Sequence, residues 1–319
     1  MRVVFFGTPE FAVPSLRALV GEGFDVAAVV TQPDAPQGRS RSKLIPPPVK
    51  VVAEAEDLVV LQPEKPADPA FLKQLRDFKP DFGVVVAYGH ILKPELLMLP
   101  TRGMVNVHPS LLPGLRGPAP VEWAILRGHE TTGVTIMQLD AGMDSGPILH
   151  QIPHRIGPDV TGGELSAHLA EVGAQALVET LTMMDQPDPP LQPVPQKEDR
   201  ATFAPKLTRE IARIDWTKDA RTIGSLVRAL DPRPGAWAVL NGEEIKLFNP
   251  KVMQPPFPGT GAPGEVLSAD GSLVIATGPF KDTAGGTVEI FEVQPAGRAR
   301  MATEEWLRGA RLPAGARFS

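Results

Sequence analysis

Residues 81–113 of this 319-residue chain read DFGVVVAYGHILKPELLMLPTRGMVNVHPSLLP. The stretch opens with one valine-rich apolar run at 81–87 and contains a second at 103–108. Short apolar runs of this kind are typical of strands that are buried on both faces of a parallel sheet. The stretch therefore predicts two successive strands of an α/β sheet.

The residues on either side continue the alternation of strand and helix. Further strands are predicted at 3–7, 26–31, 59–61, 133–139 and 147–152, and helices near 49–56, 69–78, 118–126 and 164–181. Thr8 is expected to cap a helix whose first turn contains Pro9. This alternation indicates the α/β class, with a doubly wound, Rossmann-like and mostly parallel sheet.

A second domain is predicted beyond a proline-rich segment. Residues 185–195 (DQPDPPLQPVP) lack apolar periodicity and are typical of a semi-rigid linker. A helix at 220–230 then precedes hairpin patterns with turns at Asn241-Gly242 and Asp270-Gly271, and a last strand at 287–293. We expect a first domain at 1–187, a linker at 188–204 and a smaller C-terminal OB-like β-barrel at 205–319.

The composition narrows the class of protein. The chain is 42% hydrophobic and 22% charged, and no apolar run approaches the roughly 20 residues of a membrane span. Cysteine is absent, which excludes disulfides, thiolate nucleophiles and cysteine-ligated zinc. The N-terminal residues read as a strand and not as a signal peptide. We therefore expect a cytoplasmic protein without a membrane anchor, and we expect it to be a monomer.

The first strand and turn, VVFFGTP at 3–9, resemble the start of a dinucleotide-binding unit. The G-x-G-x-x-G pattern, whose glycines let the backbone approach a pyrophosphate, is missing. A nicotinamide oxidoreductase is therefore disfavoured, and the turn is interpreted as structural.

Two polar side chains stand at the end of the strand predicted at 103–108. Asn106 and His108 are two residues apart, so the pleat of a strand places both on one face. Ligands bind at the carboxyl ends of strands in open α/β sheets. An amide and an imidazole there would stabilise an oxyanion, although a histidine in this position is also common as a structural hydrogen-bonding group.

A second polar segment, DAGMDSG at 140–146, is predicted to lie in a loop between two strands. Its residue types are compatible with a simple turn, a magnesium site or a catalytic carboxylate, whereas a calcium loop would need more oxygen ligands. If Asp144 lay near His108, it would orient the ring and stabilise its cationic form.

These blocks together resemble the folate-dependent formyltransferases. The family pattern reads N-x-H-x-S-L-L-P, then R-G-x-x-P, then D-x-G-x-D-x-G, and this chain matches it at 106–113, 116–120 and 140–146. The resemblance implies a catalytic trio of Asn106, His108 and Asp144, with 10-formyltetrahydrofolate as formyl donor and no metal. It also implies that two segments border the folate pocket. They are Ala87, Tyr88, Gly89 and His90, and Ser110, Leu111, Leu112 and Pro113.

The resemblance also indicates an acceptor. Family members that act on glycinamide ribonucleotide end after the first domain, whereas the blocks at 31–34 (TQPD), 38–43 (GRSRSK) and 203–216 (FAPKLTREIARIDW) are similar to members that act on methionyl-tRNA. The resemblance thus implies transfer of formyl to the α-amine of methionyl-initiator-tRNA. The expected tRNA contacts are Arg39, Arg41, Lys43 and Lys206.

The distribution of charge does not by itself decide whether the acceptor is a tRNA. The net charge of −5 argues against a general nucleic-acid binder. Residues 1–187 hold 15 Lys+Arg and 21 Asp+Glu, whereas residues 188–319 hold 17 and 16, so the acidic excess lies in the first part. Two alternatives remain at this stage: formylation of a nucleotide-linked amino sugar, and a folate- or RNA-binding module without catalysis.

Overall fold

The protein folds into two compact units. The computed structural model describes residues 1–37, 43–186, 191–253, 261–279, 285–310, 312–313 and 315–319. The first unit comprises Met1–Pro120, Thr131–Arg155 and Ser166–Ala204. The second comprises Val121–Glu130, Ile156–Leu165 and Pro205–Ser319. The second unit therefore takes in two short segments that precede its main part in the chain.

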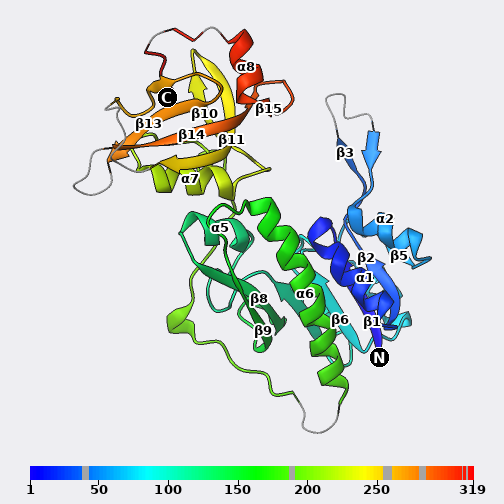
Figure 1. Ribbon diagram of the computed structural model, residues 1–319. Coiled ribbons are helices and arrows are strands. Elements are labelled where there is room, and N and C mark those ends of the chain that lie inside the picture. Colours follow the sequence, from blue (N-terminus) through cyan, green and yellow to red (C-terminus); the bar gives the residue numbers. More distant parts are fainter. Residues whose placement is uncertain (38–42, 187–190, 254–260, 280–284, 311, 314) are drawn as a thin grey trace. The chain divides into compact units, whose positions relative to one another are not determined.

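The first unit is built on a seven-stranded sheet with the order β5-β2-β1-β6-β7-β8-β9 (Figure 1). The first five strands of that order are parallel, and β8 and β9 are antiparallel. The strands are β1 (Arg2–Gly7), β2 (Asp25–Val30), β5 (Val60–Leu61), β6 (Phe82–Val86), β7 (Met104–His108), β8 (Thr131–Gln138) and β9 (Ile148–Arg155). The expected mostly parallel sheet is confirmed.

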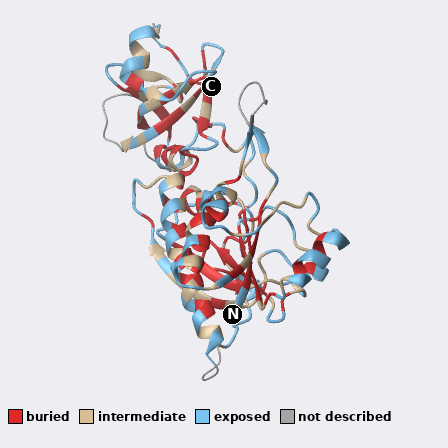
Figure 2. Ribbon diagram, turned by 90° about the vertical axis from the view of Figure 1, so that its right-hand side faces the viewer, coloured by how far each residue is buried: buried red, intermediate tan, exposed pale blue. Residues whose placement is uncertain are grey.

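Helices cover both faces of this sheet, and Figure 2 shows the strands buried between them. They are α1 (Val13–Gly21), α2 (Pro48–Ala55), α3 (Pro69–Asp77), α4 (Pro94–Leu97) and the long α6 (Gly162–Asp185). On one face, Met104 of β7 belongs to a core cluster with residues of α3 and α4. On the other, a Cβ at Gly173 of α6 would lie 2.8 Å from Val107 Cγ1, so α6 packs directly on β7.

The expectation that Thr8 caps a helix is wrong. The turn after β1 forms a short 3-10 helix, η1 (Glu10–Ala12), and its N-cap residue, Pro9, makes no side-chain cap. The Thr8 hydroxyl instead donates to the Tyr88 carbonyl oxygen at 3.0 Å. Thr8 therefore ties the ends of β1 and β6 together, because a tertiary partner was available for its hydroxyl.

A short antiparallel pair, β3 (Ala35–Gln37) and β4 (Lys43–Ile45), stands apart from the main sheet. It flanks the basic segment that was expected to be a loop. Asp34 directly precedes β3 and anchors the strand pair at that end. Its carboxylate accepts hydrogen bonds from Lys50 Nζ at 2.9 Å and Gln62 Nε2 at 2.7 Å. Both partners hold the pKa of Asp34 below its usual value.

The second unit is an antiparallel β domain with the strand order β10-β11-β14-β13-β12, and β15 pairs with β14 (Figure 1). The strands are β10 (Ala236–Leu240), β11 (Glu243–Met253), β12 (Val266–Ser268), β13 (Leu273–Pro279), β14 (Gly285–Pro295) and β15 (Met301–Ala302). Its helices are α7 (Ala220–Ala229) and α8 (Thr303–Gly309). Asp219 caps α7 by accepting from two backbone N–H groups.

The C-terminal residues close this sheet. Phe318 bridges to Leu240 at one edge, and Arg317 bridges to Glu265 at the other. The segment 316–319 thus joins the two edges, which gives the unit the closed character of a barrel. The predicted turn at Asn241-Gly242 is confirmed, since both residues have positive φ, 52° and 83°, as a type I′ hairpin requires.

The remaining elements are α5 (Pro120–Leu126) and the 3-10 turn η2 (Glu198–Arg200). Within the described part of the chain, no helix is both long and apolar enough to cross a membrane.

Candidate active site

The candidate site lies where β7 ends. Asn106 and His108 alternate along β7 with Val105 and Val107, and Val107 faces α6. The two polar side chains therefore share the opposite face. Both are largely buried, with 9% of Asn106 and 4% of His108 exposed. A buried amide and a buried imidazole need hydrogen-bond partners, and these partners determine whether each group can donate or accept a proton.

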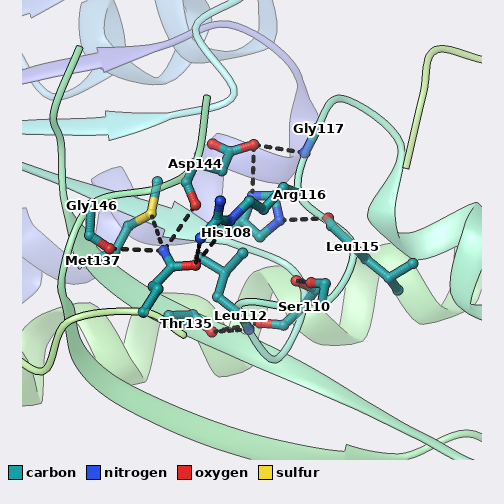
Figure 3. Close-up of polar contacts among 12 residues, drawn as sticks. His108, Ser110, Leu112, Leu115, Arg116, Gly117, Thr135, Met137, Asp144 and Gly146 are labelled. Carbon is teal, nitrogen blue, oxygen red and sulfur yellow. Dashed lines mark hydrogen bonds and ion pairs between the residues drawn. The ribbon is translucent and has the colours of Figure 1, made fainter. Parts of the chain in front are cut away.

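His108 has one neighbour at each ring nitrogen (Figure 3). Its Nε2 lies 3.1 Å from the Leu115 carbonyl oxygen, which can only accept, so the ring donates from Nε2. Its Nδ1 lies 3.8 Å from Asp144 Oδ2. Burial lowers the pKa of His108 below its usual value, and Asp144 opposes this only in part. The structure therefore favours a neutral resting ring, in contrast to the protonated ring expected from the sequence.

The loop between β8 and β9 carries Asp144. Asp144 adopts a left-handed backbone conformation with φ 52°, which aspartate tolerates better than most residues. Its Oδ2 accepts a hydrogen bond from the Gly117 N–H at 2.8 Å. Within the loop, Asp140 accepts from the Gly142 N–H and from the Ser145 hydroxyl, at 2.9 and 3.0 Å. The expected proximity of Asp144 to His108 is thus present.

The Asn106 side chain differs from its neighbours. Among the described residues, none forms a hydrogen bond with its amide, and the amide atoms do not belong to the fully buried polar atoms that lack a partner, so a ligand or water can still reach them. A largely buried amide without a partner is costly unless a ligand or water supplies one. Asn106 is therefore available to donate to a bound group.

Ser110, Leu111, Leu112 and Pro113 form the turn after β7. The Ser110 hydroxyl donates to the Gly114 carbonyl oxygen at 2.6 Å, and the Ser110 carbonyl oxygen accepts from the Thr135 hydroxyl at 2.6 Å. The Leu112 N–H donates to the same Thr135 oxygen at 3.1 Å. These contacts fix the turn, while Leu111 and Pro113 stay partly accessible.

Ala87, Tyr88, Gly89 and His90 follow β6 at the same edge of the sheet. The Tyr88 side chain is buried against Phe6, and burial raises its pKa to about 12. Its carbonyl oxygen accepts hydrogen bonds from the Thr8 hydroxyl at 3.0 Å and from Gln32 Nε2 at 3.2 Å. Ala87, Gly89 and His90 are exposed, and Ala87 has a positive φ of 47°.

Arg116, Gln196 and Glu198, for which the sequence predicts no role, connect the segments around the site. Arg116 is 4% exposed, and its guanidinium donates to both oxygens of Glu198, at 2.7 and 2.9 Å. It also donates to Gln196 Oε1 at 2.8 and 3.0 Å. Arg116 belongs to a recognisable motif, but Gln196 and Glu198 lie in the expected linker, where no sequence pattern marks them.

The expected tRNA contacts are only partly described. Arg39 and Arg41 lie outside the described residues, and Lys43 begins β4. Lys206 is exposed in the second unit. Among the side chains that the structure describes, no group of three or more His, Asp or Glu is arranged to hold a metal ion.

Comparison with known proteins gives the family. Residues 1–181 match the family described as Formyl transferase, and residues 206–311 match Formyl transferase, C-terminal domain. The chain belongs to the formyl transferase family. The methionyl-tRNA formyltransferase of Chloroflexus aurantiacus is 44% identical over 309 residues, which cover 97% of each chain. The expected membership of this enzyme family is confirmed.

Solved structures share the formyl transferase fold at lower identity. HypX from Aquifex aeolicus, solved with tetrahydrofolic acid, superposes with a TM-score of 0.67 at 22% identity, over 96% of this chain and 47% of HypX. An N-formyltransferase from Helicobacter canadensis, solved with folinic acid and dTDP-3-aminofucose, gives 0.68 at 18% identity, over 92% and 98%. These likenesses support the two-unit fold.

Proposed function

We propose that this formyl transferase moves the formyl group of 10-formyltetrahydrofolate to the α-amine of methionyl-initiator-tRNA, in the cytoplasm. The proposal depends chiefly on the His108–Asp144 pair at the end of β7, beside an Asn106 amide that no described residue binds. The 44% identity to a methionyl-tRNA formyltransferase over nearly the whole of both chains supports the acceptor.

The residues at this edge of the sheet fit a formyl donor. The Asn106 amide needs a partner, and a carbonyl oxygen would provide one. 10-Formyltetrahydrofolate would supply a formyl carbon on a nitrogen that leaves once it regains a proton. The exposed residues Ala87, Gly89 and His90 are proposed to border the folate, together with the turn that contains Leu111 and Pro113.

Asn106 is proposed to donate a hydrogen bond to the formyl oxygen. The acceptor amine attacks the formyl carbon, a new C–N bond forms, and negative charge develops on this oxygen. A donor that is already in place stabilises that charge without reorganisation. Because no described residue binds the amide, Asn106 can donate to the formyl oxygen without first breaking a hydrogen bond to any of them.

His108 is proposed to act as a base. In the neutral ring Nε2 carries the proton, which is shared with the Leu115 carbonyl, so Nδ1 has a free lone pair. Nδ1 would take the proton that the amine loses, directly or through water. Asp144, 3.8 Å away, stabilises the resulting imidazolium. The distance is long for a hydrogen bond, as is common before substrates bind.

The proposed function is tested by comparing which of two acceptors the protein formylates. Purified protein is incubated with 10-formyltetrahydrofolate and either methionyl-initiator-tRNA or a nucleotide-linked amino sugar. We expect N-formylmethionyl-tRNA and no formylated sugar. Formylation of the sugar alone would replace the proposed acceptor with the alternative one. Absence of product from both, with folate bound, would leave the non-catalytic binding module as the better description.

A further inference from the structure

The segment that follows α6 crosses the candidate site. Residues 194–204, here called the strap, begin with Val194, which exchanges two backbone hydrogen bonds of 2.8 Å with Ile148 at the start of β9. The strap ends at Ala204, whose N–H donates to the Arg116 carbonyl oxygen at 2.7 Å. The whole strap lies in the first unit. It therefore contacts both loops that hold the catalytic pair.

Gln196 lies near the start of the strap and makes five hydrogen bonds, the longest of them from its Nε2 to Met137 Sδ at 4.0 Å. Its Nε2 donates to the carbonyl oxygens of Asp144 and Gly146, at 2.9 and 2.8 Å. Its Oε1 accepts two hydrogen bonds from the buried Arg116. The Gln196 amide thus links the backbone of the loop between β8 and β9, which carries Asp144, to the segment after β7.

The strap is itself firmly attached. The Thr202 hydroxyl accepts from the Leu115 N–H at 2.9 Å, and the Thr202 carbonyl oxygen accepts from the Arg116 N–H at 2.8 Å. A Cβ at Gly117 would lie 2.7 Å from the Ala204 carbonyl oxygen, so the two backbones touch. Leu115 and Gly117 are the residues whose backbone groups bind His108 and Asp144.

We infer that Gln196 is a positioning residue for Asp144 and that the strap completes the catalytic unit. The left-handed backbone at Asp144 is less favourable than the right-handed one even for aspartate, so contacts from outside the loop help to hold it. Gln196 supplies two of them, on the carbonyls of Asp144 and Gly146. The inference rests on the proposed function only in naming the reaction that this position serves.

The two halves of the Gln196 amide can be tested separately. Gln196→Ala removes every hydrogen bond of the side chain. Gln196→Glu can still accept from Arg116 but cannot donate, and it places negative oxygen against two carbonyl oxygens. Gln186→Ala, at an exposed position just after α6, is the matched control. We expect kcat to fall by roughly 10- to 100-fold in both Gln196 variants and KM for either substrate to change little, because misplacement of a catalytic group acts on the chemical step.

The pH profile separates positioning from general damage. A displaced Asp144 stabilises the His108 imidazolium less, so the acid limb of the kcat profile should move to lower pH in both Gln196 variants. If Gln196→Glu had wild-type kcat and an unmoved profile while Gln196→Ala was impaired, the Arg116 contact alone would matter. The inferred role toward Asp144 would then be overturned.

Hydrogen exchange provides a readout that needs no activity. In the full-length protein, amides of residues 140–146 should exchange at least several-fold faster in Gln196→Ala than in the wild type and in Gln186→Ala, with β6 and β7 unchanged. Unchanged exchange in this loop would overturn the inference even if the proposed reaction is correct. Faster exchange in a protein that formylates nothing would support the positioning role of Gln196 and reject the proposed function.

Discussion

His108 is the proposed base, and burial and its neighbours set its charge. Burial lowers its pKa, while the unfolded chain takes up the proton near its ordinary value of about 6.5. Below that pH the unfolded state binds more protons than the folded state. The stability that comes from a neutral His108 is therefore complete above about pH 6.5 and declines as the pH falls toward the lowered pKa.

This gives a prediction for stability. Between pH 7.5 and 5.5 the wild type should lose more free energy of unfolding than His108→Gln, which has no titrating ring at this position. Urea titrations of both proteins at the two pH values measure the difference. Equal losses would mean that His108 titrates alike in the folded and unfolded chains.

A second prediction concerns Asp144. Asp144→Asn keeps the shape of the side chain but removes the charge that stabilises the imidazolium, so kcat should fall by roughly 10²-fold, a general acid–base effect. Folate affinity should stay within a few-fold of the wild type, and the exposed Asp77→Asn is the control. If binding titrations showed folate affinity collapsing while bound donor turned over normally, Asp144 would be a binding residue.

At the residue scale, sequence patterns identify groups but not their partners. The spacing of Asn106 and His108 is enough to place both on one face of a strand. The neutral state of the ring depends on the Leu115 carbonyl and on burial, which only the folded chain reveals. Gln196 could not be predicted, because a polar residue in a proline-rich segment has no periodicity to mark it.

The loop between β8 and β9 is the element that fixes the site. Gly146 ends this loop, and a Cβ there would lie 1.9 Å from the Gln138 carbonyl oxygen. Because that oxygen is backbone, Gly146→Ala must shift the loop, and Asp144 moves with it. We expect kcat to fall by at least about 10²-fold, the scale for a misplacement of about 1 Å.

The matched control is Gly21→Ala at the end of α1, where a Cβ would meet no atom within 4 Å. It should leave kcat unchanged and stabilise the helix slightly, because alanine has the higher helix propensity. Steady-state kinetics and thermal melts of both variants check this. Normal turnover in Gly146→Ala would show that the loop relaxes without moving Asp144.

Elements with strong apolar patterns were predicted well. The runs at 81–87 and 103–108 correspond to β6 (Phe82–Val86) and β7 (Met104–His108). The hairpin of β3 and β4 and the closing segment at 316–319 were missed, since both are short and lack alternation. Their pairing depends on contacts distant in sequence, which local patterns do not report.

At the scale of the whole molecule, we propose that local basic patches hold the tRNA, because the net charge of the chain is −5. The region from Lys206 to Lys251 holds nine Lys/Arg against six Asp/Glu. Lys50 is excluded as a free cation, since Asp34 pairs with it at 2.9 Å. The order and class of the two units followed from the sequence, whereas the course of the strap across the site did not.

The basic segment between β3 and β4 is proposed to contact tRNA phosphates. Neutralising Arg39, Arg41 and Lys43 together should raise KM for tRNA. The slope of the logarithm of tRNA affinity against the logarithm of salt concentration should become less negative, by roughly 0.7 for each single-strand phosphate that the variant no longer neutralises. Folate affinity should not change. Normal use of tRNA by the triple alanine variant at every salt concentration would mean that the segment is merely solvated.

The most direct test of the account is a single-turnover measurement with saturating 10-formyltetrahydrofolate and methionyl-initiator-tRNA. Formation of N-formylmethionyl-tRNA is followed by rapid quench in the wild type and in Asn106→Ala, with binding of both substrates measured separately. We predict product in the wild type and a rate roughly 10²–10³-fold lower in the variant, as for loss of one oxyanion donor, with binding intact. Equal rates in the two proteins would contradict it.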